Sequence, residues 1–185
     1  MKLGSDQPDL DDIDFGILNA LQENCRISLA DIGAEVGLSA PSVMQRVKKL
    51  EDGGVIRGYH AVLDAKRLGM DVTAFIGVSI NHPTLIDRFE AEIDRVEGVL
   101  ECHHVTGGYT LLLKAKTRDT STLETLISRI RSLPGVERTE TMVVLSTHSE
   151  DTELDLPKGA DATAAAPTGK RTRRNGERVA AGSRS

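Results

Sequence analysis

The chain has 185 residues, of which 23 are Lys or Arg and 28 are Asp or Glu, and its formal net charge at pH 7 is -5. Hydrophobic residues make up 39% and charged residues 28%, a composition typical of a globular chain with one or two small domains. The longest apolar run covers only residues 142–145, and two cysteines cannot form a disulfide framework. The first residues lack an apolar stretch, so we expect a cytoplasmic protein without a secretory signal or a membrane span.

Three short helices are predicted over residues 10–52. The first begins at Asp11, the second has Ser28 as its N-cap and ends at Gly37, and the third has Ser39 as its N-cap with Pro41 in its first turn. Only residues 37–39 separate the second helix from the third. A three-residue turn with glycine between two short helices is typical of a helix-turn-helix.

The third of these helices has the pattern of one that reads DNA. Val43, Val47 and Leu50 fall on one side as a buried stripe, and short polar groups followed by cations fall on the other, which suits entry into the major groove. A solvated polar face is the alternative interpretation. The tight turn before the helix and an expected hairpin wing over residues 55–62 favour DNA. The expected DNA contacts are Ser39, Pro41, Ser42, Gln45, Arg46, Lys49 and Arg57, of which Ser42 and Gln45 would touch base edges and Arg46, Lys49 and Arg57 phosphates.

Residues 38–59 resemble the Lrp/AsnC (feast/famine) transcription regulators. The family pattern LSxxxVxxRVxxLExxGVIxGY is met at every fixed position. The resemblance covers about residues 10–149. It implies a winged helix-turn-helix domain over residues 10–62, a linker over 63–71, and an effector-binding and oligomerisation domain over 72–149. It further implies dimers that assemble into tetramers or octamers.

The residue pattern of the second half of the chain also predicts a fold for that half. Strands are expected over residues 72–81, 100–105, 109–116 and 136 to about 146, with helices over residues 85–96 and 123–133. This βαββαβ order is typical of a ferredoxin-like domain, in which both helices cover one face of an antiparallel sheet. The whole chain is therefore predicted to be an α+β protein.

The other face of that sheet is expected to be apolar and uncovered. Residues 111–113 and 142–145 are apolar at successive positions, whereas a strand with one face in water should alternate. A second copy of the sheet is the simplest cover. A helix-turn-helix protein also needs two recognition helices about 34 Å apart to read a palindromic site. Both arguments predict a homodimer.

An effector site follows from the resemblance. In the Lrp/AsnC family the small molecule lies at the contact between dimers, beside a turn with the pattern GDxDY. The matching residues are Gly107, Gly108, Tyr109, Thr110 and Leu111, so Gly108 and Thr110 replace both acids of the pattern and Leu111 replaces its aromatic residue. Glu101 and Glu140 are the candidate substitutes for binding an ammonium group. We expect a weak or altered response to amino acids, with an apolar or aromatic effector favoured.

Other chemistry has weaker support in the sequence. Cys102, His103 and His104 alternate along a strand, so at most two share a face, and no second cluster offers further ligands. We expect no metal, no cofactor and no catalytic residues. The alternatives are a siroheme decarboxylase of similar architecture, in which His103 or His104 would serve the tetrapyrrole, and an amino-acid sensor without DNA. The complete, basic recognition helix disfavours both.

The end of the chain differs sharply in charge. Residues 157–185 hold seven Lys or Arg against two acids, a net charge of +5, which leaves -10 for the residues before them. Val179 is the one larger aliphatic residue in this stretch, which contains no aromatic residue. Such a segment cannot bury enough apolar surface to fold. We expect a disordered basic tail, which either contacts DNA phosphates non-specifically or only keeps the protein soluble.

Overall fold

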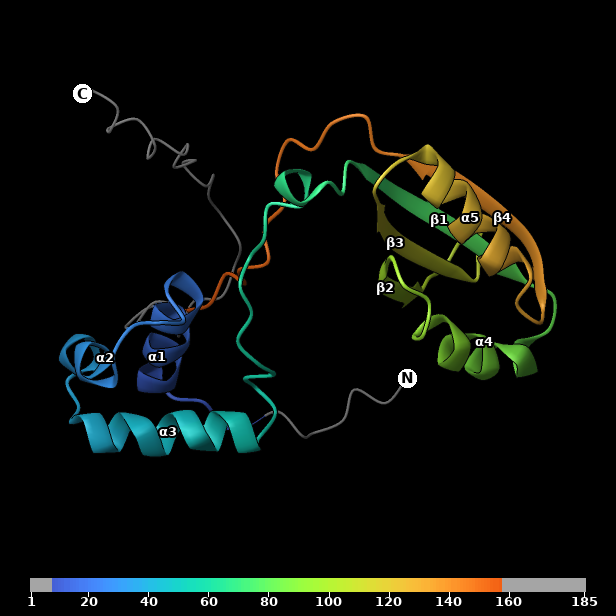
Figure 1. Ribbon diagram of the computed structural model, residues 1–185. Helices are drawn as coiled ribbons and strands as arrows, with labels where there is room; N and C mark the ends of the chain where they lie inside the picture. The colour runs from blue at the N-terminus through green and yellow to red at the C-terminus, as the bar shows by residue number, and fades with distance from the viewer. Residues whose placement is uncertain (1–7, 158–185) are drawn as a thin grey trace, which may run out of the picture. The chain divides into compact units, whose positions relative to one another are not determined.

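The computed structural model describes residues 8–157 (Figure 1). They form two compact units, one made of residues 8–59 together with residues 152–157, and the other made of His60–Asp151. The predicted basic tail lies outside the described residues except for its first residue, Pro157. Among the described residues, no helix is long and apolar enough to cross a membrane.

The first unit is built on three helices. They are α1 (Asp12–Glu23), α2 (Leu29–Val36) and α3 (Ala40–Asp52). The side chains of Ser28 and Ser39 accept hydrogen bonds from backbone N–H groups in the first turns of α2 and α3, as their cap positions predict. Gly37 ends α2 at φ 71°, a left-handed conformation that glycine adopts without steric cost. The turn between α2 and α3 is therefore encoded locally.

The core of this unit fixes the orientation of α3. Ile17, Ile32 and Val43 are fully buried, one from each helix. Figure 1 shows α3 running past α1 and α2 at the edge of the unit. Hydrophobic burial of one side of α3 therefore leaves its opposite side available for a ligand.

The hairpin expected over residues 55–62 of the winged helix-turn-helix does not form. Between α3 and the first strand, the described chain contains no strand. Instead, the backbone N–H groups of Val55 and Ile56 both donate to the carbonyl of Leu50, and the two side chains pack against the core of the helices. Because these apolar residues fold back onto the end of α3, they cannot extend into a ladder.

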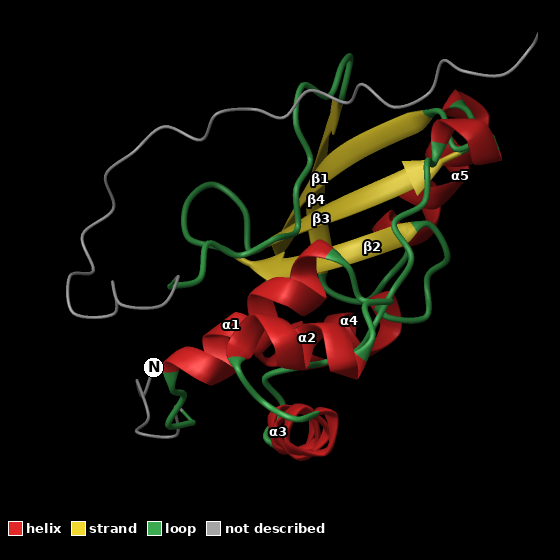
Figure 2. Ribbon diagram, turned by 90° about the vertical axis from the view of Figure 1, so that its left-hand side faces the viewer, coloured by secondary structure: helices red, strands yellow, loops and turns green. Residues whose placement is uncertain are grey.

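The second unit contains a four-stranded antiparallel sheet with the order β2-β3-β1-β4 (Figure 2). Its elements are β1 (Val72–Ile80), α4 (Ile86–Ile93), β2 (Val99–His104), β3 (Leu111–Thr117), α5 (Thr120–Arg131) and β4 (Val136–Val143), with short 3-10 turns at Lys66–Leu68 and Pro83–Leu85. This is the predicted ferredoxin-like βαββαβ arrangement. The last strand ends at Val143, three residues before the predicted end.

One face of this sheet packs against α4 and α5. Ile76 and Leu113 of the central strands are fully buried, together with Phe89, Ile93 and Ile130 of the helices. Strand register places alternate residues on the opposite side, which we call the open face. It comprises Thr73, Phe75, Gly77, Ser79, Glu101, His103, Leu112, Lys114, Lys116, Arg138, Glu140 and Met142.

The expectation of an apolar open face is met only at Phe75, Leu112 and Met142. Leu111 and Leu113 point to the helices, so Leu112 is the one leucine of that run on the open face, and Lys114 and Lys116 follow it. In the run 142–145, the strand ends at Val143, and Leu145 beyond it is exposed. The apolar run 111–113 thus belongs to a strand whose alternate residues face the helices. The apolar run 142–145 extends past the end of β4. The open face is a mixture of apolar and charged side chains.

Candidate nucleic-acid interface and ligand-binding surface

The outer side of α3 carries most of the predicted DNA contacts. Pro41, Gln45 and Lys49 are exposed, and Ser42 is half-buried. The hydroxyl oxygens of Ser39 and Ser42 lie 2.9 Å apart at the start of the helix, where the backbone N–H groups of a helix N-terminus are directed outward. The side of the helix opposite Val43 and Leu50 therefore offers short polar groups at its N-terminal end and cations further along.

Arg46 lies on the same helix but has partners within the protein. Its Nη1 atom is 2.7 Å from Oδ2 of Asp11 and 2.8 Å from Oδ1 of Asp14. Asp14 is buried, with only 2% of its side chain exposed, whereas 30% of the Arg46 side chain is exposed. Hydrogen bonds to Asp11 and then to Asp14 raise the pKa of Arg46, so the guanidinium stays charged. Arg46 thus joins the recognition helix to the start of α1.

The two aspartates form the N-terminal cap of α1. The Asp14 backbone N–H donates to Oδ1 of Asp11 at 2.8 Å, and the Asp11 N–H donates to Oδ2 of Asp14 at 3.2 Å. The pKa of Asp11 is lowered, first by the cap hydrogen bond from Asp14 and then by Arg46. The sequence predicts the start of α1 at Asp11 but not the ion pair with Arg46. A buried acid on the apolar side of a helix is the signal that could have indicated it.

The segment after α3 is held by a second contact that the sequence did not indicate. The hydroxyl of Tyr59 donates to Oε1 of Glu51 at 2.9 Å, which ties the chain beyond exposed Arg57 to the last turn of the recognition helix. Burial and the neighbouring carboxylate raise the pKa of Tyr59 to about 12. The position of Arg57 relative to α3 therefore depends on this tyrosine.

This contact predicts an unusual alkaline titration. The chain contains two tyrosines and no tryptophan, so phenolate absorbance follows the tyrosines alone. Because the folded-state pKa of Tyr59 is raised, its contribution to stability is present below pH 10 and is lost as the pH rises through about 12. We expect little phenolate in the native protein at pH 10, and Glu51→Gln should lower the pKa of Tyr59. Complete ionisation of both tyrosines near pH 10 in folded protein would contradict this assignment.

The turn matched to the family's effector site joins β2 to β3. Gly107 adopts φ 123°, which favours glycine. The Tyr109 ring lies directly over Gly77, since a Cβ added there would be 2.6 Å from Cδ1 of the ring. The hydroxyl of Thr110 accepts a hydrogen bond from the Ile80 N–H at 3.1 Å. The turn is therefore attached to β1 by Tyr109 and Thr110.

The two candidate acids have different surroundings. A hydrogen bond to Glu140 raises the pKa of Tyr109, and Glu140 also accepts from Nη2 of Arg138 at 2.6 Å. Glu101 instead lies on β2, with Nε2 of His103 at 3.1 Å and Nζ of Lys114 at 3.2 Å. His103 and then Lys114 lower the pKa of Glu101. The structure therefore brings Glu140 to the turn, whereas Glu101 is paired with His103 and Lys114 further along the sheet.

The contact between Tyr109 and Gly77 predicts that adding a methyl group at position 77 lowers the stability of the protein. Gly77→Ala forces the ring to move, and we expect a loss of about 1–3 kcal/mol in the free energy of unfolding. Gly108→Ala is the matched control, because nothing lies within 4 Å of its added Cβ. In a Tyr109→Ala background, Gly77→Ala should cost little, since a strand favours alanine over glycine. Denaturant unfolding measures the wild type and these four variants, and an equal loss from Gly77→Ala in both backgrounds would refute the stacking.

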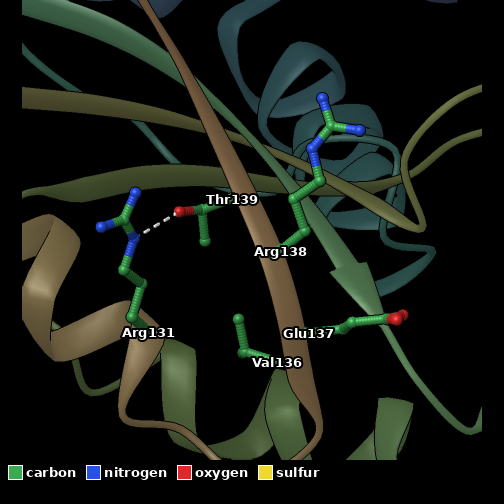
Figure 3. Close-up of a pocket in the computed structure, with 5 residues that line it drawn as sticks. All are labelled: Arg131, Val136, Glu137, Arg138 and Thr139. Atoms are coloured by element: carbon green, nitrogen blue, oxygen red, sulfur yellow. Dashed lines mark hydrogen bonds between the residues drawn. The ribbon is translucent and has the colours of Figure 1, made fainter.

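A shallow pocket of about 310 Å³ lies beside the edge strand β4. It is lined by Arg131, Val136, Glu137, Arg138 and Thr139. In Figure 3 the Arg131 side chain points toward Thr139, to whose hydroxyl its Nε donates at 2.8 Å, whereas Arg138 points to the other side of the strand. None of the residues matched to the effector turn lines this pocket. It is therefore a separate hollow of this unit.

The cysteine and histidines of β2 are divided between the faces of the sheet. Cys102 pairs in register with Leu113 and packs against the helix-covered core, while His103 pairs with Leu112 on the open face. Burial raises the pKa of Cys102 to about 11. Within the described part of the chain, no group of three or more His, Cys, Asp or Glu side chains is placed to hold a metal ion.

Together, a helix-turn-helix with an exposed outer side and a separate ferredoxin-like unit give the architecture of a two-domain DNA-binding regulator. Comparison with known families agrees with this class. The profile of a winged helix-turn-helix DNA-binding domain matches residues 10–57, and that of the Lrp/AsnC ligand binding domain matches residues 73–154.

Comparison with individual proteins identifies the family of the chain. It is 34% identical over 147 residues to the HTH-type transcriptional regulator FL11 of Pyrococcus abyssi, covering 80% of this chain and 97% of that protein. It is 36% identical over 149 residues to the leucine-responsive regulatory protein of Escherichia coli K12, covering 79% and 91%. The chain belongs to the Lrp/AsnC family and is a DNA-binding transcriptional regulator.

Solved structures agree with this assignment. AsnC of Escherichia coli superposes with a TM-score of 0.72 at 30% identity, covering 78% of this chain and 97% of AsnC. A transcriptional regulator of Neisseria meningitidis, solved as a complex with L-Met, gives a TM-score of 0.73 at 32% identity, covering 78% and 96%.

Proposed function

We propose that the protein regulates transcription by reading a specific DNA sequence with α3. The observation that carries this proposal is the exposed outer side of a well-capped recognition helix. Ser42 and Gln45 lie at the end that suits base edges, and Lys49 lies where a phosphate contact is expected. Ser39, Pro41 and Arg57 flank this surface. In this proposal Arg46 mainly positions the helix, because its Nη1 is already paired with Asp11 and Asp14.

A direct test uses competition between DNA fragments. Labelled genomic fragments are mixed with the protein and an excess of random duplex DNA, and the retained fragments are separated by gel shift. Sequence-specific binding predicts retention of a minority of fragments at competitor levels that release the rest. Equal release of all fragments would show that binding is only electrostatic.

We propose that the working form is a homodimer that assembles further, through the open face of the sheet. Leu112 and half-exposed Met142 offer apolar surface there, and Glu101, Lys114 and Lys116 offer both signs of charge. Two copies would also supply the pair of recognition helices that a palindromic site requires. Sedimentation velocity tests this, and a Leu112→Lys variant should shift the protein toward monomer.

We propose that a small molecule, an amino acid or a related compound, modulates DNA binding at the turn of residues 107–110. The support is the matched ligand-binding family and the L-Met complex of one similar structure. In this chain Glu140 is the acid beside Tyr109, and it already pairs with Arg138. An ammonium group would compete with that cation for the carboxylate.

This arrangement predicts a restricted effector response. We expect weak binding of polar amino acids and stronger binding of apolar or aromatic ones, because an unpaired ammonium group is costly to bury. Calorimetry against the twenty amino acids measures it, with Glu140→Gln as the test and Glu137→Gln as a control on the same strand. Tight binding of a charged amino acid that survives Glu140→Gln and Glu101→Gln would contradict the proposed roles of these acids.

The proposed role is that of a regulator rather than an enzyme. A tetrapyrrole decarboxylase would have no use for an exposed basic recognition helix, and the relatives described above are transcription regulators. The absorption spectrum of the protein mixed with a tetrapyrrole distinguishes the two functions. A shifted visible band that depends on His103 or His104 would favour the enzyme.

A further inference from the structure

The C-terminal end of the described chain packs against α1 of the first unit. We call residues 152–157 the strap. The backbone N–H of Leu154 donates to Oε1 of Gln22 at 2.8 Å, and Nε2 of Gln22 donates back to the Leu154 carbonyl at 3.2 Å. Nδ2 of Asn19 donates to the Pro157 carbonyl at 3.2 Å. Leu156 is half-buried against the core of the three helices.

These contacts recognise an extended backbone. The primary amide of Gln22 presents one donor and one acceptor to the same residue, as a neighbouring β-strand would. Asn19 lies three positions earlier on α1 and therefore on the same side of the helix. Leu156 adds apolar contact between the hydrogen-bonded residues Leu154 and Pro157. The side of α1 that carries Asn19 and Gln22 therefore has a defined occupant.

The residues just before the strap are held within the second unit. The carboxylate of Glu150 forms ion pairs with Nζ of Lys114 and, at 3.5 Å, with Nζ of Lys116 on the open face. The hydrogen bond from Lys114 is the first cause of the lowered pKa of Glu150. Three residues separate Glu150 from Leu154, so one short segment is anchored to a different unit at each end.

We propose that the side of α1 formed by Asn19 and Gln22 is a docking surface for the chain's own strap, and that this docking gives the DNA-binding unit a second tether besides the linker of residues 60–71. A unit held at two points samples fewer orientations than a unit held at one. In a dimer, two DNA-binding units restricted in this way would lose less conformational entropy when they bind two half-sites than two units held only by the linker. Operator binding would therefore be stronger. The last consequence rests on the proposed DNA-binding function, whereas the docking itself does not.

Hydrogen exchange of the full-length protein tests the docking. The Leu154 amide should exchange at least about tenfold more slowly than in an unstructured peptide, and Gln22→Ala should remove that protection. Glu23→Ala, on the exposed neighbouring residue, should leave it unchanged. Absence of protection in the wild type, or protection that survives Gln22→Ala, would overturn the proposal. Protection that rises with protein concentration would identify the occupant as the strap of a second copy and overturn the assignment within one chain.

DNA binding tests the second tether. On a duplex selected by the wild-type protein, Gln22→Ala should weaken binding about 3–10-fold, with no change on a duplex that carries one half-site. Leu154→Pro removes the donor from the strap without altering α1 and should have the same effect. Lost Leu154 protection with unchanged affinity would overturn the tether. If the wild-type protein binds all DNA sequences equally, the proposed function is wrong. In that case hydrogen exchange of Leu154 is the test of whether the strap docks on α1.

Discussion

Replacing Arg46 by alanine should destabilise the first unit by about 2–4 kcal/mol, because it leaves the buried carboxylate of Asp14 without its cation. A substitution at an exposed site on the same helix should cost far less, so Lys48→Ala is the matched control and should stay within about 0.5 kcal/mol. Denaturant unfolding followed by circular dichroism measures both variants. A loss from Arg46→Ala as small as that from Lys48→Ala would contradict the proposed positioning role.

A double-mutant cycle separates this role from a phosphate contact. If Arg46 acts through Asp14, then Arg46→Ala should cost much less in an Asp14→Ala background, with a coupling energy of about 1 kcal/mol or more. If Arg46 instead contacts phosphate, the variant should keep its stability and lower the salt slope of DNA binding by about one. Stability and salt dependence together therefore decide between the two roles.

Gln45→Ala and Lys49→Ala should weaken DNA binding in different ways. Both side chains are exposed on the outer side of α3, but an amide reads base edges and an ammonium group pairs with phosphate. We expect Gln45→Ala to lose about 1–3 kcal/mol of discrimination at one or two base pairs. Lys49→Ala should weaken binding to every sequence and reduce the salt slope by about one.

Fluorescence anisotropy on a selected duplex and a random duplex, at several salt concentrations, measures both effects. Glu35→Ala, an exposed residue of α2, serves as the control substitution. If Gln45→Ala and Lys49→Ala gave the same uniform loss on both duplexes, the division between base and phosphate contacts would be refuted.

The features that the sequence predicted correctly are those set by neighbouring residues. Ser28, Gly37 and Ser39 act through hydrogen bonds and backbone angles within one helical turn, so their pattern is sufficient to predict the helix-turn-helix. The order of strands and helices in the second unit likewise follows from alternation and helical spacing along short segments.

The features that the sequence missed join distant residues. Arg46 and Asp11 are 35 positions apart, and Gln22 and Leu154 are 132 apart, so no local pattern indicates either pair. The hairpin over residues 55–62 was mispredicted because residues 55–56 have the composition of a strand but pack their side chains against the helices. On the sheet, Leu112 continued an apolar run in sequence while pointing to the opposite face from Leu111 and Leu113.

Selection from a random pool of duplexes tests the central claim, that α3 reads a DNA sequence, most directly. The full-length protein and Gln45→Ala are each incubated with the pool, and the retained duplexes are sequenced. The wild type should enrich two inverted half-sites with centres about 34 Å apart, and Gln45→Ala should lose preference at one or two positions in each. Retention of duplexes without any enriched motif, or an identical motif for both proteins, would contradict the account.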